Sequence, residues 1–369
     1  MIGHKRFGSR EGGVEVVVTE LAKRMAALGH EVTCYDRSGS DVITGDVTET
    51  RERFVDGVRV VPVKTIDKKG LAAASASYYA TKAAIADKPD VIHFHAEGPC
   101  ACLPMARRAG IRTVATIHGL DWQRAKWGRL GSAYIKHGEK AAAKCADEII
   151  VLSRSAQDYF EQTYNRSTVF IPNGMNPKEY RPADEIEKRW CLEKNSYILF
   201  LGRLVPEKRP ELLIEAFKRL DTDKRLVIAG GASDTSEYEK QLRDMAEGDK
   251  RILFTGFVTG NTLAELYSNA YCYVLPSDVE GMPMSLLEAM SYGCCCVTSD
   301  IPECADVLAG SGRTFKHGDA DDLLRVLAGL INAPEFAGDL GEAAKSHVLS
   351  TYDWDSVVER TLAVYGGIC

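Results

Sequence analysis

The chain has 369 residues, 45% of them hydrophobic and 27% charged, with a formal net charge of −6 at pH 7. These values fit an ordinary globular chain long enough for two domains, and the negative charge argues against a nucleic-acid binder. No apolar run reaches the roughly 20 residues of a membrane span, and no secretory signal pattern begins the chain, so we expect a cytoplasmic protein.

The first half alternates strand-like and helical segments. A helical periodicity covers residues 14–28 and ends at Gly29, a suitable C-cap. Only Met1 and Ile2 precede the first loop, although the first strand of such a fold is usually central. This strand is therefore either a stub or the chain begins inside the natural protein. Further strands are predicted at residues 31–35, 58–63, 91–95, 113–117 and 148–152.

A second series of strands follows a break in the pattern. Residues 171–177 are rich in turn formers, and residues 181–194 are polar. Strands are then predicted at residues 198–201, 225–229, 252–255, 272–275 and 295–298. Strands that alternate with helices predict parallel sheets covered on both faces. We therefore expect an α/β chain of two doubly wound, Rossmann-like domains that face each other across a cleft.

The most specific motif occupies residues 280–288. Glu280 lies in a loop after a predicted strand, and Glu288 lies inside the helix that follows. Pro283 suits the first helical turn, in which Ser285 is polar and free N–H groups favour a phosphate. The two carboxylates can accept hydrogen bonds from hydroxyls on different parts of one long ligand. The alternative is a helix with an N-terminal acid and an ordinary surface glutamate.

A second motif, residues 202–210, directly follows the apolar strand 198–201. It would place Arg203 and Lys208 at the end of that strand. Two cations there suit a diphosphate, whose charge must be stabilised as it leaves. The alternative is a pair of solvated loop cations.

Two weaker motifs lie in the first half. Gly12 and Gly13 follow Glu11 at the start of the first helix and would allow a phosphate or sugar to approach the backbone, although a plain glycine turn is the alternative. His118 ends a predicted strand and precedes a glycine, so it is expected to face the cleft. The chain has no G-x-G-x-x-G fingerprint for a nicotinamide cofactor.

Together these motifs resemble the retaining GT-B glycosyltransferases of family 4, also called group 1. Residues 280–288 match the E-x7-E element of that family, residues 202–208 its GR…EK element, and Gly12 and Gly13 its glycine loop. Residues 171–174 resemble its interdomain segment, and residues 352–354 the start of its last helix. The resemblance implies an acceptor domain at residues 1–177, a nucleotide-sugar domain at 178–350, and a helix at 351–369 that returns to the first domain.

The resemblance also implies roles for single residues. Arg203 and Lys208 would bind the diphosphate, Glu288 the ribose and Glu280 the transferred sugar. His118 would lie near the reaction centre, and the expected catalytic set is His118, Arg203, Lys208 and Glu280. Residues expected to bind the nucleotide sugar are Gly12, Gly13, Arg203, Lys208, Gly256, Phe257, Val258, Glu280, Gly281, Met282, Pro283, Met284, Ser285, Leu286 and Glu288.

The implied reaction is transfer of a hexose with retained anomeric configuration. The sugar would come from a UDP-sugar or GDP-mannose and pass to a hydroxyl of a glycan or lipid-linked glycan in cell-surface polysaccharide synthesis. Neither a cofactor nor a metal is expected, because two cations can stabilise the leaving group. An epimerase or phosphorylase of the same fold, and a non-catalytic sugar-nucleotide binder, are the alternatives.

Two further patterns are interpreted as structural. The D-x-D sequences at residues 221–223 and 319–321 adjoin helix ends, where the second is favoured by the helix dipole. The eleven cysteines are odd in number, and Cys294, Cys295 and Cys296 are consecutive. We therefore expect reduced thiols and no disulfide or zinc framework.

Residues 122–144 combine tryptophans with cations. Residues 1–180 carry 26 basic against 21 acidic residues, a net charge of +5, and the remainder carries 20 against 31, or −11. We expect this segment to bind the inner face of an anionic membrane peripherally. A solvated helix whose tryptophans lie in the core is the alternative. The residues concerned are Trp122, Arg124, Lys126, Trp127, Arg129, Lys136, Lys140 and Lys144.

Overall fold

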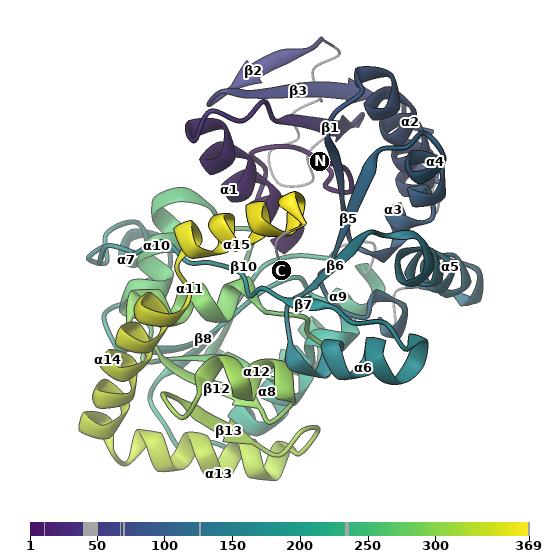
Figure 1. Ribbon diagram of the computed structural model, residues 1–369. Coiled ribbons are helices and arrows are strands. Elements are labelled where there is room, and N and C mark those ends of the chain that lie inside the picture. The colour runs from purple at the N-terminus through teal and green to yellow at the C-terminus, as the bar shows by residue number, and fades with distance from the viewer. Residues whose placement is uncertain are drawn as a thin grey trace. The chain divides into compact units, whose positions relative to one another are not determined.

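The computed structural model describes residues 1–10, 12–39, 51–66, 68, 71–124, 127–232 and 236–367 (Figure 1). The chain divides into two compact units, Met1–Gly174 with Trp354–Cys369, and Met175–Asp353. Each unit is an α/β structure whose strands pair in parallel, apart from one antiparallel pair in the first unit, which confirms the predicted fold class. Within the described part of the chain, no helix has both the length and the apolarity needed to cross a membrane.

The second unit, Met175–Asp353, is built on a parallel six-stranded sheet. Its strands run in the order β10-β9-β8-β11-β12-β13. The chain enters at β8, builds outward to β10, and then returns to the other side of β8 with β11. The strands are β8 (Tyr197–Leu201), β9 (Arg225–Ala229), β10 (Ile252–Gly256), β11 (Cys272–Leu275), β12 (Cys295–Ser299) and β13 (Arg313–Phe315).

Helices cover both faces of this sheet, so its strands are apolar along their whole length. Ile198, Leu199 and Phe200 in β8 are all fully buried, although they point alternately to opposite faces. The helices are α7 (Glu185–Trp190), α8 (Pro210–Lys218), α9 (Ser236–Ala246), α10 (Gly260–Asn269), α11 (Met284–Tyr292), α12 (Pro302–Leu308), α13 (Ala320–Ile331) and α14 (Pro334–Thr351), with a 3₁₀ turn η2 (Pro206–Lys208).

The first unit contains two hydrogen-bonded sets of strands, β1-β3-β2 and β4-β5-β6-β7. Met1 and Ile2 lie between them: the Ile2 N–H donates to His93, and the Tyr35 N–H donates to Met1. These two residues thus lie at the central strand position of the unit. The strands are β1 (Thr33–Arg37), β2 (Arg53–Val55), β3 (Val58–Val63), β4 (Val91–His95), β5 (Arg112–Ile117), β6 (Glu148–Val151) and β7 (Val169–Phe170).

The last helix, α15 (Trp354–Gly366), belongs to the first unit and packs on α1 (Gly13–Ala27), as the yellow and purple ribbons of Figure 1 show. The Arg24 guanidinium lies 5.8 Å from the centroid of the Trp354 ring. The return of the C-terminal helix is therefore confirmed. The other helices are α2 (Ala72–Asp87), α3 (Glu97–Cys100), α4 (Leu103–Arg108), α5 (Arg129–Cys145) and α6 (Arg154–Tyr164), with a 3₁₀ turn η1 (Asp121–Gln123).

Candidate functional site

The order of strands in the second unit marks one place for a ligand. β8 and β11 are neighbours, but the chain leaves them in opposite directions across the sheet. Loops that diverge from such a switch point leave a crevice at the carboxyl ends of the strands. Arg203 follows β8 by two residues and Lys208 ends η2, while Glu280 lies in the loop after β11. The two strongest motifs therefore meet at this edge of one sheet.

Lys208 and Glu280 are in direct contact. The Lys208 Nζ atom lies 2.5 Å from Oε1 of Glu280, and the two side chains are only 12% and 7% exposed. Burial and then the Glu280 carboxylate raise the pKa of the nearby Cys304 thiol. The arrangement holds an ammonium group at the switch point without leaving its charge unpaired.

Glu288 lies in the second turn of α11, the helix that follows β11. Its Oε1 atom is 3.9 Å from Nζ of Lys178, and its Oε2 atom is 3.5 Å from the Tyr267 hydroxyl. The pair of carboxylates predicted from the motif thus spans the loop and the helix. One detail of the prediction is wrong: Pro283 is the N-cap of α11, and the first turn begins at Met284.

The loop between the two carboxylates is buried. Gly281, Met282, Pro283 and Leu286 are inaccessible to solvent, and Met284 is partly accessible. The Ser285 hydroxyl accepts a hydrogen bond of 2.8 Å from Tyr273. Most side chains here are buried, so contacts with a ligand could come from backbone groups and from the partly accessible Met284 and Ser285.

Residues 256–258 lie at the carboxyl end of β10, the edge strand of the same sheet. Gly256 has a φ of +71°, which a side chain rarely adopts. Phe257 is 41% exposed, and its ring packs so closely on Gly231 that a Cβ there would lie 2.5 Å from the ring. Val258 is half-buried. An exposed aromatic ring and a glycine turn thus lie together, with the Gly256 carbonyl already accepting the Gly230 N–H at 2.9 Å.

In the first unit, the paired glycines open α1. Gly12 is its N-cap and Gly13 its first residue, while Glu11 lies outside the described residues. The Glu15 carboxylate accepts the Lys5 N–H at 3.0 Å, which ties the first turn of the helix to the opening loop.

His118 directly follows β5 in the first unit. Its Nε2 atom lies 3.1 Å from Nδ1 of His95, the last residue of β4. Burial lowers the pKa of His118 to about 4, although Asp121 and Glu15 act in the opposite direction. At neutral pH the ring is therefore uncharged and can both donate and accept one hydrogen bond.

Sequence reasoning missed several polar residues around these positions. Lys178 and Tyr267 contact Glu288, and His95 contacts His118. The only sequence signal was the position of His95 at the end of an apolar run, the same signal that identified His118. The contacts made by Lys178 and Tyr267 depend on how the segment before α7 and helix α10 pack on α11, which no local pattern reveals.

Two cations of the segment 122–144 contact neighbouring side chains. The Lys136 ammonium lies 3.8 Å from the centroid of the half-buried Trp122 ring and 3.0 Å from the Tyr159 hydroxyl. Arg124 pairs with Asp121 at 2.7 Å. Part of the Trp122 ring is therefore covered by a partly exposed lysine, and the predicted role of this segment at a membrane surface stays a prediction.

The exposed face of α5 is nonetheless basic. Leu130 is 89% exposed at the start of the helix. Trp127 is half-buried, and Lys126 lies outside the described residues. The cations exposed along α5 are Arg129, Lys140 and Lys144.

The D-x-D sequence at residues 319–321 makes structural contacts. Asp319 caps α13 by accepting the N–H groups of Asp321 and Asp322, as expected for an acid at a helix N-terminus. Asp321 pairs with Arg219 at 2.6 Å. Residues 221–223 lie between α8 and β9. Among the residues that the structure describes, no three histidine, cysteine or acidic side chains gather as a metal site requires.

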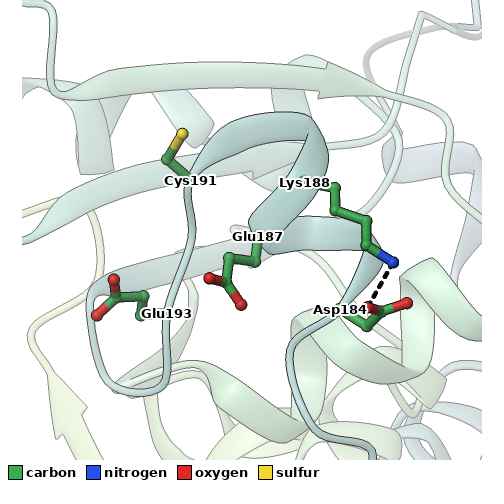
Figure 2. Close-up of a pocket in the computed structure, with 5 residues that line it drawn as sticks. All are labelled: Asp184, Glu187, Lys188, Cys191 and Glu193. Atoms are coloured by element: carbon green, nitrogen blue, oxygen red, sulfur yellow. Dashed lines mark ion pairs between the residues drawn. The ribbon is translucent and has the colours of Figure 1, made fainter.

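A pocket elsewhere on the second unit does not contain the predicted residues. Figure 2 shows Asp184, Glu187, Lys188, Cys191 and Glu193 around it, at and after α7. Lys188 already pairs with Asp184 at 2.6 Å. Its lining is a solvated acidic surface, so we assign it no function.

Two family models match the chain, one in each half. The model described as glycosyl transferases group 1 matches residues 183–347. The model described as glycosyltransferase family 4 matches residues 11–179. The matches thus include His118 in one half, and the Lys208–Glu280 pair and Glu288 in the other.

The relatives of the chain include proteins whose names state a reaction. The alpha-maltose-1-phosphate synthase of Mycolicibacterium smegmatis is 28% identical, covering 69% of this chain and 73% of its own. The UDP-Gal:alpha-D-GlcNAc-diphosphoundecaprenol alpha-1,3-galactosyltransferase of Escherichia coli is 30% identical, covering 58% of this chain and 59% of its own. The GDP-mannose-dependent alpha-(1-6)-phosphatidylinositol monomannoside mannosyltransferase of M. smegmatis is 26% identical, over 75% and 76%.

Solved structures share the fold of the whole chain. Sucrose-phosphate synthase from Thermosynechococcus elongatus superimposes with a TM-score of 0.83 at 20% identity, covering 100% of this chain and 95% of that one. Anabaena HepE in complex with UDP-glucose gives a TM-score of 0.77 at 17% identity, over 98% of each chain. At these identities the likeness is one of fold, and it confirms the GT-B architecture.

Proposed function

The chain belongs to the group 1 and family 4 glycosyltransferases, and we propose that it transfers a hexose from a nucleotide-diphosphate sugar with retention of the anomeric configuration. The observation that carries the proposal is the buried contact between Lys208 and Glu280 at the switch point of the second sheet. This unit would bind the nucleotide sugar, and the first unit the acceptor.

The proposed catalysis is electrostatic. When the bond between the sugar carbon and the diphosphate oxygen breaks, negative charge develops on the leaving group. Lys208, held by Glu280, and Arg203 at the end of β8 would stabilise that charge. Because the two cations supply this stabilisation, we propose that the reaction needs no divalent metal. His118 would act near the transferred sugar.

The proposed nucleotide site extends along the same edge of the sheet. Glu288 would accept the ribose hydroxyls, and Lys178 would orient its carboxylate. Backbone groups at residues 256–258 would hold the base, beside the exposed Phe257 ring. We propose a UDP-sugar, with GDP-mannose as the second candidate, since relatives named above use one or the other.

The proposed acceptor is a hydroxyl of a glycan or lipid-linked glycan. Two relatives act on lipid-linked or lipid acceptors by name. The exposed basic face of α5, with Leu130 at its start, would dock on an anionic membrane, at the inner face of the bilayer. Soluble glycans are the alternative acceptors.

The test is the release of nucleoside diphosphate from a panel of UDP-, GDP- and ADP-sugars, with and without glycan acceptors. Release that rises on addition of an acceptor, with a new glycoside formed, supports transfer. An epimerase would change the sugar without acceptor-dependent release. A non-catalytic binder would bind a nucleotide and release nothing.

A further inference from the structure

The turn at the end of β4 carries two fully buried polar side chains, His95 and Glu97. Both reach the segment that begins at His118. Nδ1 of His95 lies 3.1 Å from Nε2 of His118, and Oε2 of Glu97 accepts the Asp121 N–H at 2.8 Å. One short turn therefore fixes both ends of the loop that carries the candidate catalytic histidine.

The turn has a backbone conformation that few residues adopt. Ala96, between the two polar residues, has φ 71° and ψ 161°, a region that is occupied almost only by glycine. Its N–H donates to the Thr116 carbonyl at 2.9 Å, which ties the turn to β5. The surrounding contacts hold a strained residue in place, and strain of this kind is concentrated at functional sites.

The segment that carries Glu97 packs against α5. A Cβ on Gly138 would lie 1.9 Å from the Glu97 carbonyl oxygen, so a glycine is needed for α3 and α5 to approach. Burial, then Asp121 and then a hydrogen bond with Glu139 raise the pKa of Glu97, so it keeps its proton. Glu139 is in turn bonded by the hydroxyls of Tyr159 and Tyr164.

The hydrogen bond between His95 and His118 needs one hydrogen, which either ring could donate. The surroundings of His95 decide which ring is the donor. Both rings are neutral, because burial lowers both pKa values and the neighbouring His93 lowers that of His95 further. Among the described residues, Nε2 of His95 is buried without a partner. If His118 were the donor, His95 would carry its own hydrogen on that buried nitrogen, as an orphaned N–H group.

Orphaned buried N–H groups are rarer than unfilled acceptors. The favoured arrangement is therefore a His95 Nδ1–H that donates to Nε2 of His118. His118 must then carry its hydrogen on Nδ1. No hydrogen bond to that atom is found among the described residues, and the ring is partly accessible.

We propose that His95 is a positioning residue that fixes His118 as the Nδ1–H tautomer, so that His118 meets the bound substrate as a hydrogen-bond donor. The inference rests on the proposed function only in assigning a substrate to that N–H group. The donor would face an oxygen of the sugar or of its diphosphate. The opposite tautomer would present a lone pair, which can accept a hydrogen bond from a sugar hydroxyl but cannot donate one to an oxygen of the diphosphate.

The test is a nitrogen-15 NMR spectrum of the full chain labelled at histidine, in which protonated and unprotonated ring nitrogens resonate far apart. A His118→Gln sample identifies the His118 signals. We expect the wild-type chain to show His118 protonated on Nδ1. We expect the same in His95→Asn, whose amide nitrogen replaces Nδ1, and loss of that preference in His95→Leu.

The activity of the same variants gives a second readout. His95→Leu should lower kcat by about 10–100-fold, the range typical of a lost supporting partner, with little change in KM for the nucleotide sugar. His95→Asn should recover most of the loss. If His95→Leu fails to fold, His95→Gln, whose amide reaches the Nε2 position instead, replaces it.

A wild-type His118 protonated on Nε2 would overturn the proposal, as would an unchanged tautomer in a folded His95→Leu or His95→Gln variant. These results do not depend on catalysis. If the tautomer is as expected and His118→Gln retains full activity, the role given to His118 under the proposed function fails while the tautomer assignment stands.

Discussion

The Nζ atom of Lys208 lies 2.5 Å from Oε1 of Glu280, although 72 positions separate the two residues in sequence. Both side chains are almost buried, so each charge depends on the other. The contact joins the loop after β8 to the loop after β11 at the switch point of the sheet. We propose that it positions the ammonium group of Lys208 for catalysis once a diphosphate is bound.

The first prediction is that Lys208 and Glu280 are energetically coupled. Lys208→Met removes the cation that lies 2.5 Å from the nearly buried Glu280 carboxylate, and Glu280→Gln removes the carboxylate charge beside that cation. The double variant removes both charges. Its loss of stability should therefore be smaller than the sum of the losses in the two single variants. We expect a coupling of about 0.5–3 kcal/mol in the free energy of unfolding from urea titrations. Strict additivity would contradict the prediction.

The second prediction concerns Glu288. At about 100 times its Kd, the preferred nucleoside diphosphate should stabilise the chain by about 2.7 kcal/mol. Glu288→Gln removes the charge that would accept the ribose hydroxyls, a loss of about 1.5–3 kcal/mol. Thermal shifts with UDP, GDP and ADP measure both effects. The matched control is Glu237→Gln on the exposed face of α9, and an equal response in the two variants would refute the assignment.

The third prediction is a pH dependence of stability. Burial lowers the pKa values of His93, His95 and His118 in the folded chain, the last to about 4. Between about pH 6.5 and pH 5 the unfolded chain therefore binds protons that the folded chain does not, and stability falls as pH falls. Each histidine contributes up to about 1.4 kcal/mol per pH unit, whereas the protonated Glu97 acts in the opposite sense.

The measurement is the slope of the free energy of unfolding against pH between 5 and 6. His95→Asn should reduce that slope by up to about 1.4 kcal/mol per pH unit. The exposed His30 is the control, since His30→Asn should leave the slope unchanged. Equal slopes for the wild type and His95→Asn would show that His95 titrates normally in the folded chain.

The fourth prediction is weak, salt-sensitive binding to anionic vesicles through the exposed face of α5. A few hundred millimolar salt should reverse the binding, because the Debye length shrinks from about 10 Å at 0.1 M to about 3 Å at 1 M. Lys140→Glu with Lys144→Glu should abolish co-sedimentation at low salt. Lys218→Glu, an exposed change in the second unit, should have little effect. No binding of the wild type even at low salt would favour a soluble acceptor.

Much of the fold could be predicted because buried parallel strands have nearly continuous apolar sequences. The strands at residues 58–63, 91–95 and 225–229 match the structure residue for residue. The short strands Arg53–Val55, Val169–Phe170 and Arg313–Phe315 were missed, since two or three residues carry no periodicity. Packing against a longer neighbour, not local pattern, makes them strands.

The candidate site could be predicted only where a motif is local. The spacing of Glu280 and Glu288 follows from one loop and one helix. The contacts of His95 with His118 and of Glu97 with Asp121 join separate strand ends, so only the folded chain brings them together. Trp122 and Lys136 likewise lie on separate elements, η1 and α5, so only the folded chain shows their contact.

The most direct test of the central claim is acceptor-dependent release of nucleoside diphosphate by the wild type, Arg203→Ala, Lys208→Ala and the exposed control Lys240→Ala, at saturating nucleotide sugar. We predict that the wild type and Lys240→Ala turn over alike, and that each of the other two loses about 10²–10³ in kcat, the cost of one transition-state donor. Unaltered turnover in both Arg203→Ala and Lys208→Ala would contradict the account.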